Sequence, residues 1–187
     1  MFKKRRHASL EARVLRSNQT AMGLLKLEKY SECLALLRSA EEKLAQAPSE
    51  LPEKGKLVAI TLNNLGCYYK KRGQLKVALE YLHSALEIEL QLVTDPAELA
   101  STYLNITAIY SGLRQHAEAL HFGRKAIQLL ESTDDRRSNR CTSLLIAYHN
   151  AGTELEHLQR FNDARQYFEK GRTFGTRYLA RNMDARS

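Results

Sequence analysis

The sequence has little of what marks a disordered, secreted or membrane-spanning protein. Only three of its 187 residues are proline, while 43% are hydrophobic and 27% charged, which is typical of an ordered globular chain. No stretch reaches the roughly 18 uninterrupted apolar residues that a membrane span needs, and the first residues contain no apolar run like that of a secretory signal. We therefore expect a soluble cytoplasmic protein with no membrane partner.

Cysteine is also scarce. Cys33, Cys67 and Cys141 lie far apart, and no pair has the CxxC spacing. This spacing argues against a metal knuckle and against a disulfide framework. We expect a reducing compartment, no metal and no other cofactor.

Recognisable catalytic motifs are missing as well. The chain has no Gly-rich phosphate loop, no GxSxG elbow and no HExxH helix. His149 and His157 share one helical face, but they are about two turns apart, too far for both to bind one metal ion easily. We expect no enzymatic activity.

What the sequence does contain is an internal repeat. A small residue marks the first helix of each copy, and a second small residue follows 12 positions later. The first marks are Ala21, Gly66, Thr107 and Gly152, at steps of 45, 41 and 45 residues, and the second marks are Cys33, Ala78, Ala119 and Ala164. Two antiparallel helices approach closely only where a small side chain faces a larger one, so small residues recur at the crossing points.

One such hairpin cannot bury its apolar face alone, but a stack of three or more can. The repeat therefore predicts an all-α fold of four helical hairpins in one domain, residues 1–187, with copies at about 8–47, 53–93, 96–132 and 136–180. Helix start and stop signals in the sequence agree with the boundaries of these copies. Gly73 is expected to end one helix, and Asp95, Pro96 and Glu98 form a helix start with a capping residue.

The chain resembles the tetratricopeptide repeat (TPR) family, which has small residues, tyrosines and alanines at these spacings. The segment Thr61-Leu62-Asn63-Asn64-Leu65-Gly66 is similar to a signature of kinesin light chain repeats, whose extended helices also suit a step longer than the minimal 34-residue unit. Departures from the pattern are Thr107, in place of glycine or alanine, and Gly123 and Gly171, in place of larger residues or alanine. The resemblance implies a right-handed superhelical solenoid.

The resemblance also implies that the first helices line a concave surface. The residue two places before each first mark would point into it, and these residues are Gln19, Asn64, Asn105 and Asn150. Asparagines at this place in the resembling families clasp the backbone of a peptide, because a carboxamide donates and accepts hydrogen bonds at once. The alternative is that asparagine here only ties adjacent helices together.

Helical geometry places further side chains beside this amide row, where they would set specificity. The polar members of this set are Lys26, Asn63, Lys71, Ser101, His149, Thr153 and His157. Lys26 and Lys71 favour an acidic ligand, whereas Ile60, Leu104 and Ile146, which belong to the same set, suit apolar side chains.

The net charge of +8 suits acidic partners, among them tubulin tails and nucleic acid. Nucleic acid is the weaker candidate, because no base-reading code is evident and the aromatic residues recur at core spacings. We therefore predict an adaptor or scaffold that binds a protein or peptide partner. The alternatives are a structural subunit of a cytoskeletal or ciliary, microtubule-associated assembly, and an RNA-associated scaffold.

Overall fold

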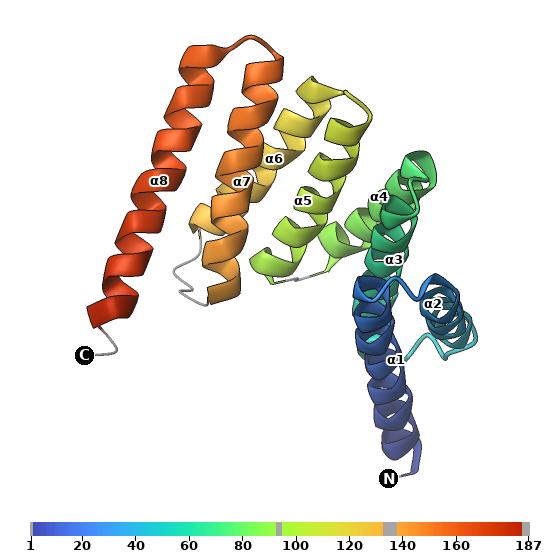
Figure 1. Cartoon of the computed structure of the whole chain (residues 1–187). Coiled ribbons are helices and arrows are strands. Elements are labelled where there is room, and N and C mark those ends of the chain that lie inside the picture. Colours follow the sequence, from blue (N-terminus) through green and yellow to red (C-terminus); the bar gives the residue numbers. More distant parts are fainter. Residues whose placement is uncertain (1, 93–94, 133–137, 185–187) are drawn as a thin grey trace. The chain divides into compact units, whose positions relative to one another are not determined.

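The computed structural model describes residues 2–92, 95–132 and 138–184, and this part of the chain is helical with short connections and contains no strand (Figure 1). The all-α prediction is confirmed. The helices are α1 Phe2–Lys26, α2 Tyr30–Ala45, α3 Lys54–Lys71, α4 Leu75–Gln91, α5 Pro96–Gly112, α6 His116–Ser132, α7 Ser138–His157 and α8 Phe161–Asp184. Side chains are described for residues 7–92, 95–132 and 140–180.

The helices form two compact units, residues 1–94 with α1 to α4 and residues 95–187 with α5 to α8. Each unit holds two hairpins. In the first unit, α1 packs on α2, α3 packs on α1 and α2, and α4 packs on α3. In the second unit, α6 packs on α5, α7 packs on α5 and α6, and α8 packs on α7. The predicted repeat boundaries stay a prediction, and residues 93 and 136 lie outside the described residues.

The turn inside each hairpin has the same geometry in all four copies. One residue takes a left-handed backbone conformation, at Glu28, Gly73, Arg114 and Gln159, with φ of 59°, 73°, 60° and 58°. The next residue then donates its N–H to the carbonyl five positions back, as Gln74 does to Tyr69 at 2.9 Å. This pattern ends a helix by satisfying one of its last carbonyls. Because the turn is the same each time, the two marks of every copy stay a constant distance apart in sequence.

Two predicted helix signals are confirmed. Helix α3 ends at Lys71, and Gly73 supplies the positive φ of the following turn. Helix α5 begins at Pro96, and the side chain of Asp95 accepts a hydrogen bond from the N–H of Ala97 at 2.9 Å. This bond satisfies one of the free amides at the helix start.

All eight marks are buried, and in the last three copies the first mark lies where the two helices of the hairpin cross closely. A Cβ atom on Gly66 would lie 2.6 Å from Cγ of Leu82, and one on Gly152 would lie 2.5 Å from Cε1 of Phe168. In these two copies the first helix supplies the small residue and the second helix supplies the large one.

The third copy reverses these roles. Thr107 occupies the first mark, and it faces Gly123 of α6, which stands at the place of Leu82 and Phe168. A Cβ atom on Gly123 would lie 3.6 Å from Cγ2 of Thr107, an ordinary contact. Thr107 and Gly123, two of the three departures from the family pattern, are therefore one exchange that preserves the packing of the pair.

No described helix has both the length and the apolar character that crossing a bilayer requires.

The crossing points predict opposite effects for two similar substitutions. Gly66→Ala should lower the free energy of unfolding by about 1–3 kcal/mol, because its new methyl group overlaps Leu82. Gly123→Ala should leave the stability unchanged or raise it by up to about 1 kcal/mol, since its methyl group fits and alanine favours helix. Urea unfolding followed by circular dichroism measures both.

The control for that comparison is Gly23→Ala in α1, where a Cβ atom would meet nothing within 4 Å. It should behave like Gly123→Ala. Equal destabilisation by Gly66→Ala and Gly123→Ala would contradict the assignment of the crossing points.

Candidate functional site

The first helix of each hairpin buries one face and leaves a second face accessible. In α3 the accessible face carries Ile60, Asn64, Cys67 and Lys71, at steps of four, three and four residues, while Leu65 on the opposite face is fully buried. These steps place the four side chains in one row along the helix. Every polar residue expected at the binding surface is at least partly accessible. Gln19, Lys26, Lys71, Ser101, His149 and His157 are exposed, and Asn63, Asn64, Asn105, Asn150 and Thr153 are partly buried.

Asn64 ties two helices of the first unit together. Its Nδ2 donates to Oδ1 of Asn18 on α1 at 2.8 Å. Asn18 is only 2% exposed, and its own Nδ2 donates to the carbonyl of Val14 at 3.1 Å and to Oγ1 of Thr61 at 3.0 Å. At Asn64 this bond is the structural role that was the alternative to peptide binding, and it uses one N–H of the Asn64 amide.

Asn18 is a residue that the sequence reasoning missed. The sequence predicts that its neighbour Gln19 is the first member of the amide row, and this residue is exposed on α1. Asn18 lies four residues after Val14 and three before Ala21, both of which are fully buried. That spacing places it on the packed face of the helix, which is the signal that could have identified it.

The two lysines of the predicted binding surface, Lys26 and Lys71, differ in whether they form an ion pair. Nζ of Lys71 lies 3.3 Å from Oε1 of Glu28, and both side chains are exposed, so this ion pair contributes little to stability. Lys26 makes no ion pair with the described residues, and it is the freer of the two to meet an acidic ligand.

The histidines of α7 do not share a site. The His149 ring contacts Phe168 of α8, with centroids 5.8 Å apart. The His157 ring instead stacks on His116 of α6 at 4.2 Å. Nδ1 of His116 lies 2.7 Å from Oε2 of Glu154, a carboxylate only 3% exposed. This contact between the two side chains links α6 to α7. The Thr153 hydroxyl donates to the carbonyl of His149 at 3.1 Å.

Cys67 packs with the core of the first unit rather than serving as a nucleophile. Burial raises the pKa of its thiol, and the nearby charge of Lys70 lowers it to a smaller extent. The thiol packs against the buried cluster that includes Cys33, Leu37 and Leu65. At neutral pH it is therefore protonated, which is the unreactive form.

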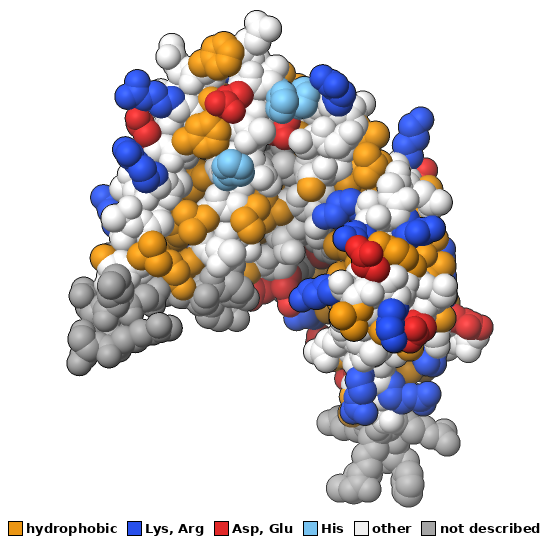
Figure 2. Space-filling model, in the orientation of Figure 1, with side chains coloured by type: hydrophobic (Ala, Val, Ile, Leu, Met, Phe, Trp, Pro, Cys, Tyr) orange, Lys and Arg blue, Asp and Glu red, His pale blue; other side chains and the backbone are white. Residues whose placement is uncertain are grey.

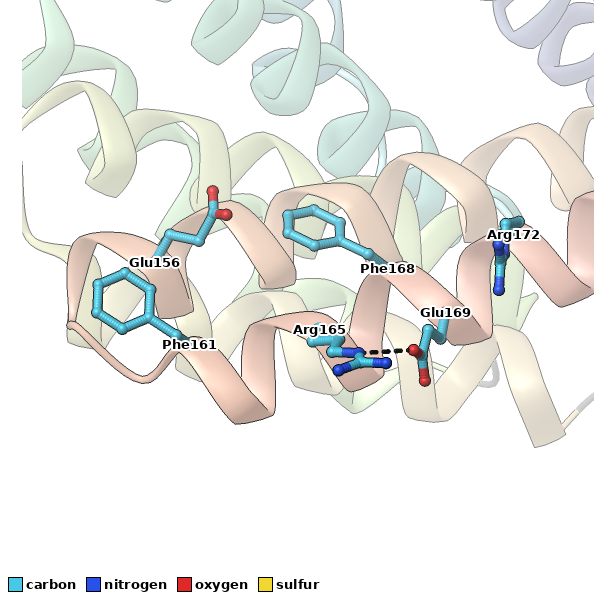
Figure 3. Close-up of a pocket in the computed structure, with 6 residues that line it drawn as sticks. All are labelled: Glu156, Phe161, Arg165, Phe168, Glu169 and Arg172. Carbon is cyan, nitrogen blue, oxygen red and sulfur yellow. Dashed lines mark hydrogen bonds and ion pairs between the residues drawn. The ribbon is translucent and has the colours of Figure 1, made fainter.

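The face of α8 in the second unit carries two open pockets that the sequence did not predict. One has a volume of about 350 Å³ and is lined by Glu156, Phe161, Arg165, Phe168, Glu169 and Arg172 (Figure 3). The other has a volume of about 400 Å³, and its lining includes Leu145, His149, Phe168, Arg172, Gly175 and Leu179. Phe168 covers Gly152 and also lines both pockets.

The hydrogen-bond network between α1 and α3 predicts that substitutions of Asn18 and Asn64 lower the stability by different amounts. Asn18→Ala should cost about 2–3 kcal/mol of unfolding free energy, because it removes three hydrogen bonds at a buried position. Asn64→Ala should cost about 1 kcal/mol, since it removes one bond at a partly accessible position. Chemical denaturation of both variants and of Gln19→Ala, which should be neutral, measures this. Equal losses for Asn18→Ala and Gln19→Ala would contradict the network.

Solved structures with the same fold have little sequence identity to this chain. BtubC (BKLC) from P. vanneervenii matches at a TM-score of 0.55 and 13% identity, over 92% of this chain and 91% of that one. A putative kinesin light chain of Podosopora anserina with nearly identical TPR-like repeats matches at 0.58 and 14%, over 90% and 97%. Aspartyl phosphate phosphatase F from Bacillus subtilis matches at 0.75 and 16%, over 90% of this chain but only 44% of its own length. At these identities the likeness shows the fold alone.

A search of curated proteins returned no match to this sequence. Two family models, both described as tetratricopeptide repeat, match residues 57–132 and 145–171, together more than half of the chain. The second match contains the last pair of marks, Gly152 and Ala164. Such repeats form scaffolds for protein interaction, because stacked hairpins present a large surface of variable side chains. The resemblance read from the sequence is therefore confirmed: the chain belongs to the tetratricopeptide repeat family.

Proposed function

We propose that this protein is a non-enzymatic adaptor that binds an extended peptide segment of a partner protein along the first helices of its hairpins. The observation that carries the proposal is the accessible row on these helices. In each hairpin the packed face of the first helix is buried, while polar side chains one or two positions away remain open to solvent.

The chemistry of the row suits a peptide backbone. In the second unit, Asn105 of α5 and Asn150 of α7 are partly accessible, with Ser101 and His149 exposed beside them. A carboxamide pairs with both the N–H and the C=O of an extended strand, whatever the side chains of that strand. In the first unit, Asn64 retains its carbonyl oxygen and its second N–H for a ligand while it is bonded to Asn18.

The residues beside the row set the preferred ligand. Ile146 of α7 is 48% exposed, so an apolar side chain of the ligand would cover it favourably. The net charge of +8 favours a peptide that also carries acidic residues, and so does Lys26, which has no ion pair within the described part of the chain.

The amides of the second unit allow a direct test. Peptides selected from a random display library against the purified protein should bind the double variant Asn105→Ala, Asn150→Ala at least about tenfold more weakly, because two amide contacts are each worth about 1 kcal/mol. Fluorescence anisotropy measures the affinity. The matched control is Asn162→Ala, an exposed asparagine on α8, which should bind like the unchanged protein.

Unchanged affinity in a double variant that keeps its melting temperature would exclude the amide row as the binding surface. Equal weakening by Asn162→Ala would exclude it as well.

A second candidate function is a structural role in a microtubule-associated assembly. The positive charge favours it, since tubulin tails are acidic, and so does the similarity of fold to the putative kinesin light chain repeats. Co-sedimentation with microtubules should then weaken as salt rises from about 50 to 200 mM, because salt screens charge interactions. Absent or salt-independent sedimentation would exclude this role.

A further inference from the structure

Asn18 of α1 is a buried amide beneath the accessible row of the first unit. Its side chain is only 2% exposed, so it cannot meet a ligand itself. It contacts Asn64, the member of the amide row on α3, through the hydrogen bond of 2.8 Å. A buried polar side chain in contact with a binding group can hold that group in one orientation. The direction of every hydrogen bond around Asn18 therefore matters for the ligand.

A backbone carbonyl fixes the orientation of the Asn18 amide. Nδ2 of Asn18 lies 3.1 Å from the carbonyl oxygen of Val14. A carbonyl oxygen only accepts hydrogen bonds, so the nitrogen end of the amide has to face it. The reverse orientation would bring two acceptor oxygens together at a buried position, which is costly.

A second backbone carbonyl accounts for the other N–H of Asn18. The hydroxyl of Thr61 donates to the carbonyl of Leu57 at 2.8 Å, which uses its only proton. The Thr61 oxygen is then an acceptor, and it receives an N–H of Asn18 at 3.0 Å. Both N–H groups of Asn18 are thus occupied, and its oxygen is the group that it offers to Asn64.

The same constraint passes on to Asn64. Because Asn18 offers an oxygen, Asn64 turns its nitrogen toward Asn18 and its own oxygen away from it. The Asn64 side chain forms no other hydrogen bond with the described residues, and its oxygen is not among their buried unpaired atoms. This oxygen is therefore an accessible acceptor, and two backbone carbonyls, those of Val14 and Leu57, determine its direction.

Asn150 of α7 provides a contrast within the same chain. It stands 86 residues after Asn64, at the corresponding place of the fourth copy. The places of the two side chains that fix Asn64 are taken by Leu104 and Ala147, which have no polar side chain. The Asn150 side chain forms no hydrogen bond within the described part of the chain. Its amide can turn either end toward a ligand, whereas the amide of Asn64 cannot.

We propose that Asn18 is a positioning residue of the peptide-binding row, which holds Asn64 so that a bound peptide meets its carbonyl oxygen and presents a backbone N–H to it. This inference rests on the proposed function, since it requires a peptide along the row. On the first unit, uncharged polar surface, drawn white, lies among basic and hydrophobic side chains (Figure 2). A peptide that crosses this surface can reach an amide without displacing an ion pair.

The fixed orientation strengthens binding because it is already present before the peptide arrives. A free carboxamide loses rotational freedom when it is bound, and it spends part of its time with the wrong end toward the ligand. An amide that the fold already holds avoids both costs. Removal of Asn18 therefore weakens the peptide even though Asn18 never contacts it.

The first test identifies the N–H that Asn64 accepts. The probe is a peptide selected from the random display library against the full chain, with analogues in which one backbone amide at a time is replaced by an ester. An ester keeps the side chain and removes the N–H. One replacement should weaken binding to the unchanged protein at least about fivefold, but binding to Asn64→Ala no more than about twofold, because the acceptor is already absent there. Fluorescence anisotropy measures the affinities.

The second test separates positioning from stability. Asn18→Leu has a similar size but no amide, so Asn64 turns freely, and the selected peptide should bind about three- to tenfold more weakly. Thr61→Val leaves Asn18 held by Val14. It should lower the melting temperature by about 3–6 °C but change the affinity no more than about twofold.

Asn18→Asp is the conservative variant in this comparison. It keeps an oxygen for Asn64, although it places a carboxyl group against the carbonyl of Val14 at a buried position. It should therefore bind the peptide more tightly than Asn18→Leu does, even where its melting temperature is lower. Affinities are compared at a temperature at which circular dichroism shows each variant to be folded. The ester series needs only Asn64→Ala, so it decides the role of Asn64 whatever the stability of the Asn18 variants.

Three outcomes would overturn the assignment of Asn18. The first is an affinity of Asn18→Leu equal to that of the unchanged protein. The second is a set of affinities that follow the melting temperatures of the three variants. The third is an ester series in which no replacement depends on Asn64.

Failure of the proposed function looks different from failure of this assignment. A selected peptide that the double variant Asn105→Ala, Asn150→Ala weakens but Asn64→Ala does not would overturn the role of Asn18 alone. A peptide that none of these substitutions weakens would overturn the proposed function, and the role of Asn18 with it.

Discussion

The close crossing of two helices inside each hairpin is the constraint on which the rest of this structure depends. At the crossings that contain Gly66, Gly123 and Gly152, one helix contributes the glycine and the other contributes the group that fills the space, as Leu82 does at Gly66. The exchange at Thr107 and Gly123 shows that the requirement applies to the pair and not to either residue alone. The left-handed turn between the helices keeps the crossing in the same register in every copy.

That constraint explains why the accessible surface is available for binding. Because the crossing and the apolar positions of each hairpin use one face of each helix, the other faces are not required for packing within the hairpin. The first helices then expose amides, lysines and histidines, and α8 exposes Phe161 and Leu179. Some of these accessible groups still stabilise the fold, as the bond between Asn64 and Asn18 does. A peptide bound at the proposed amide row would therefore contact a residue that also stabilises the first unit.

Several features of the fold were predictable because they depend on residue type and spacing. The marks, the turn at Gly73 and the cap at Asp95 follow from small side chains, the freedom of glycine and the capping chemistry of a carboxylate. The equivalent turns at Glu28, Arg114 and Gln159 were not predictable from residue type, because those residues take a left-handed conformation that their side chains disfavour. The register of the repeat identifies them once the structure of one copy is known.

The sequence by itself determined that the chain forms helical hairpins of the tetratricopeptide type, since the period of small and apolar residues specifies which faces must be buried. Only the tertiary structure decided which neighbour each polar residue meets. It assigned Asn64 to Asn18, directed His149 and His157 toward different helices, and placed Phe168 of α8 over Gly152 of α7. The physical reason is that spacing along one helix defines a direction around its axis, whereas the contact made in that direction depends on which helix packs there.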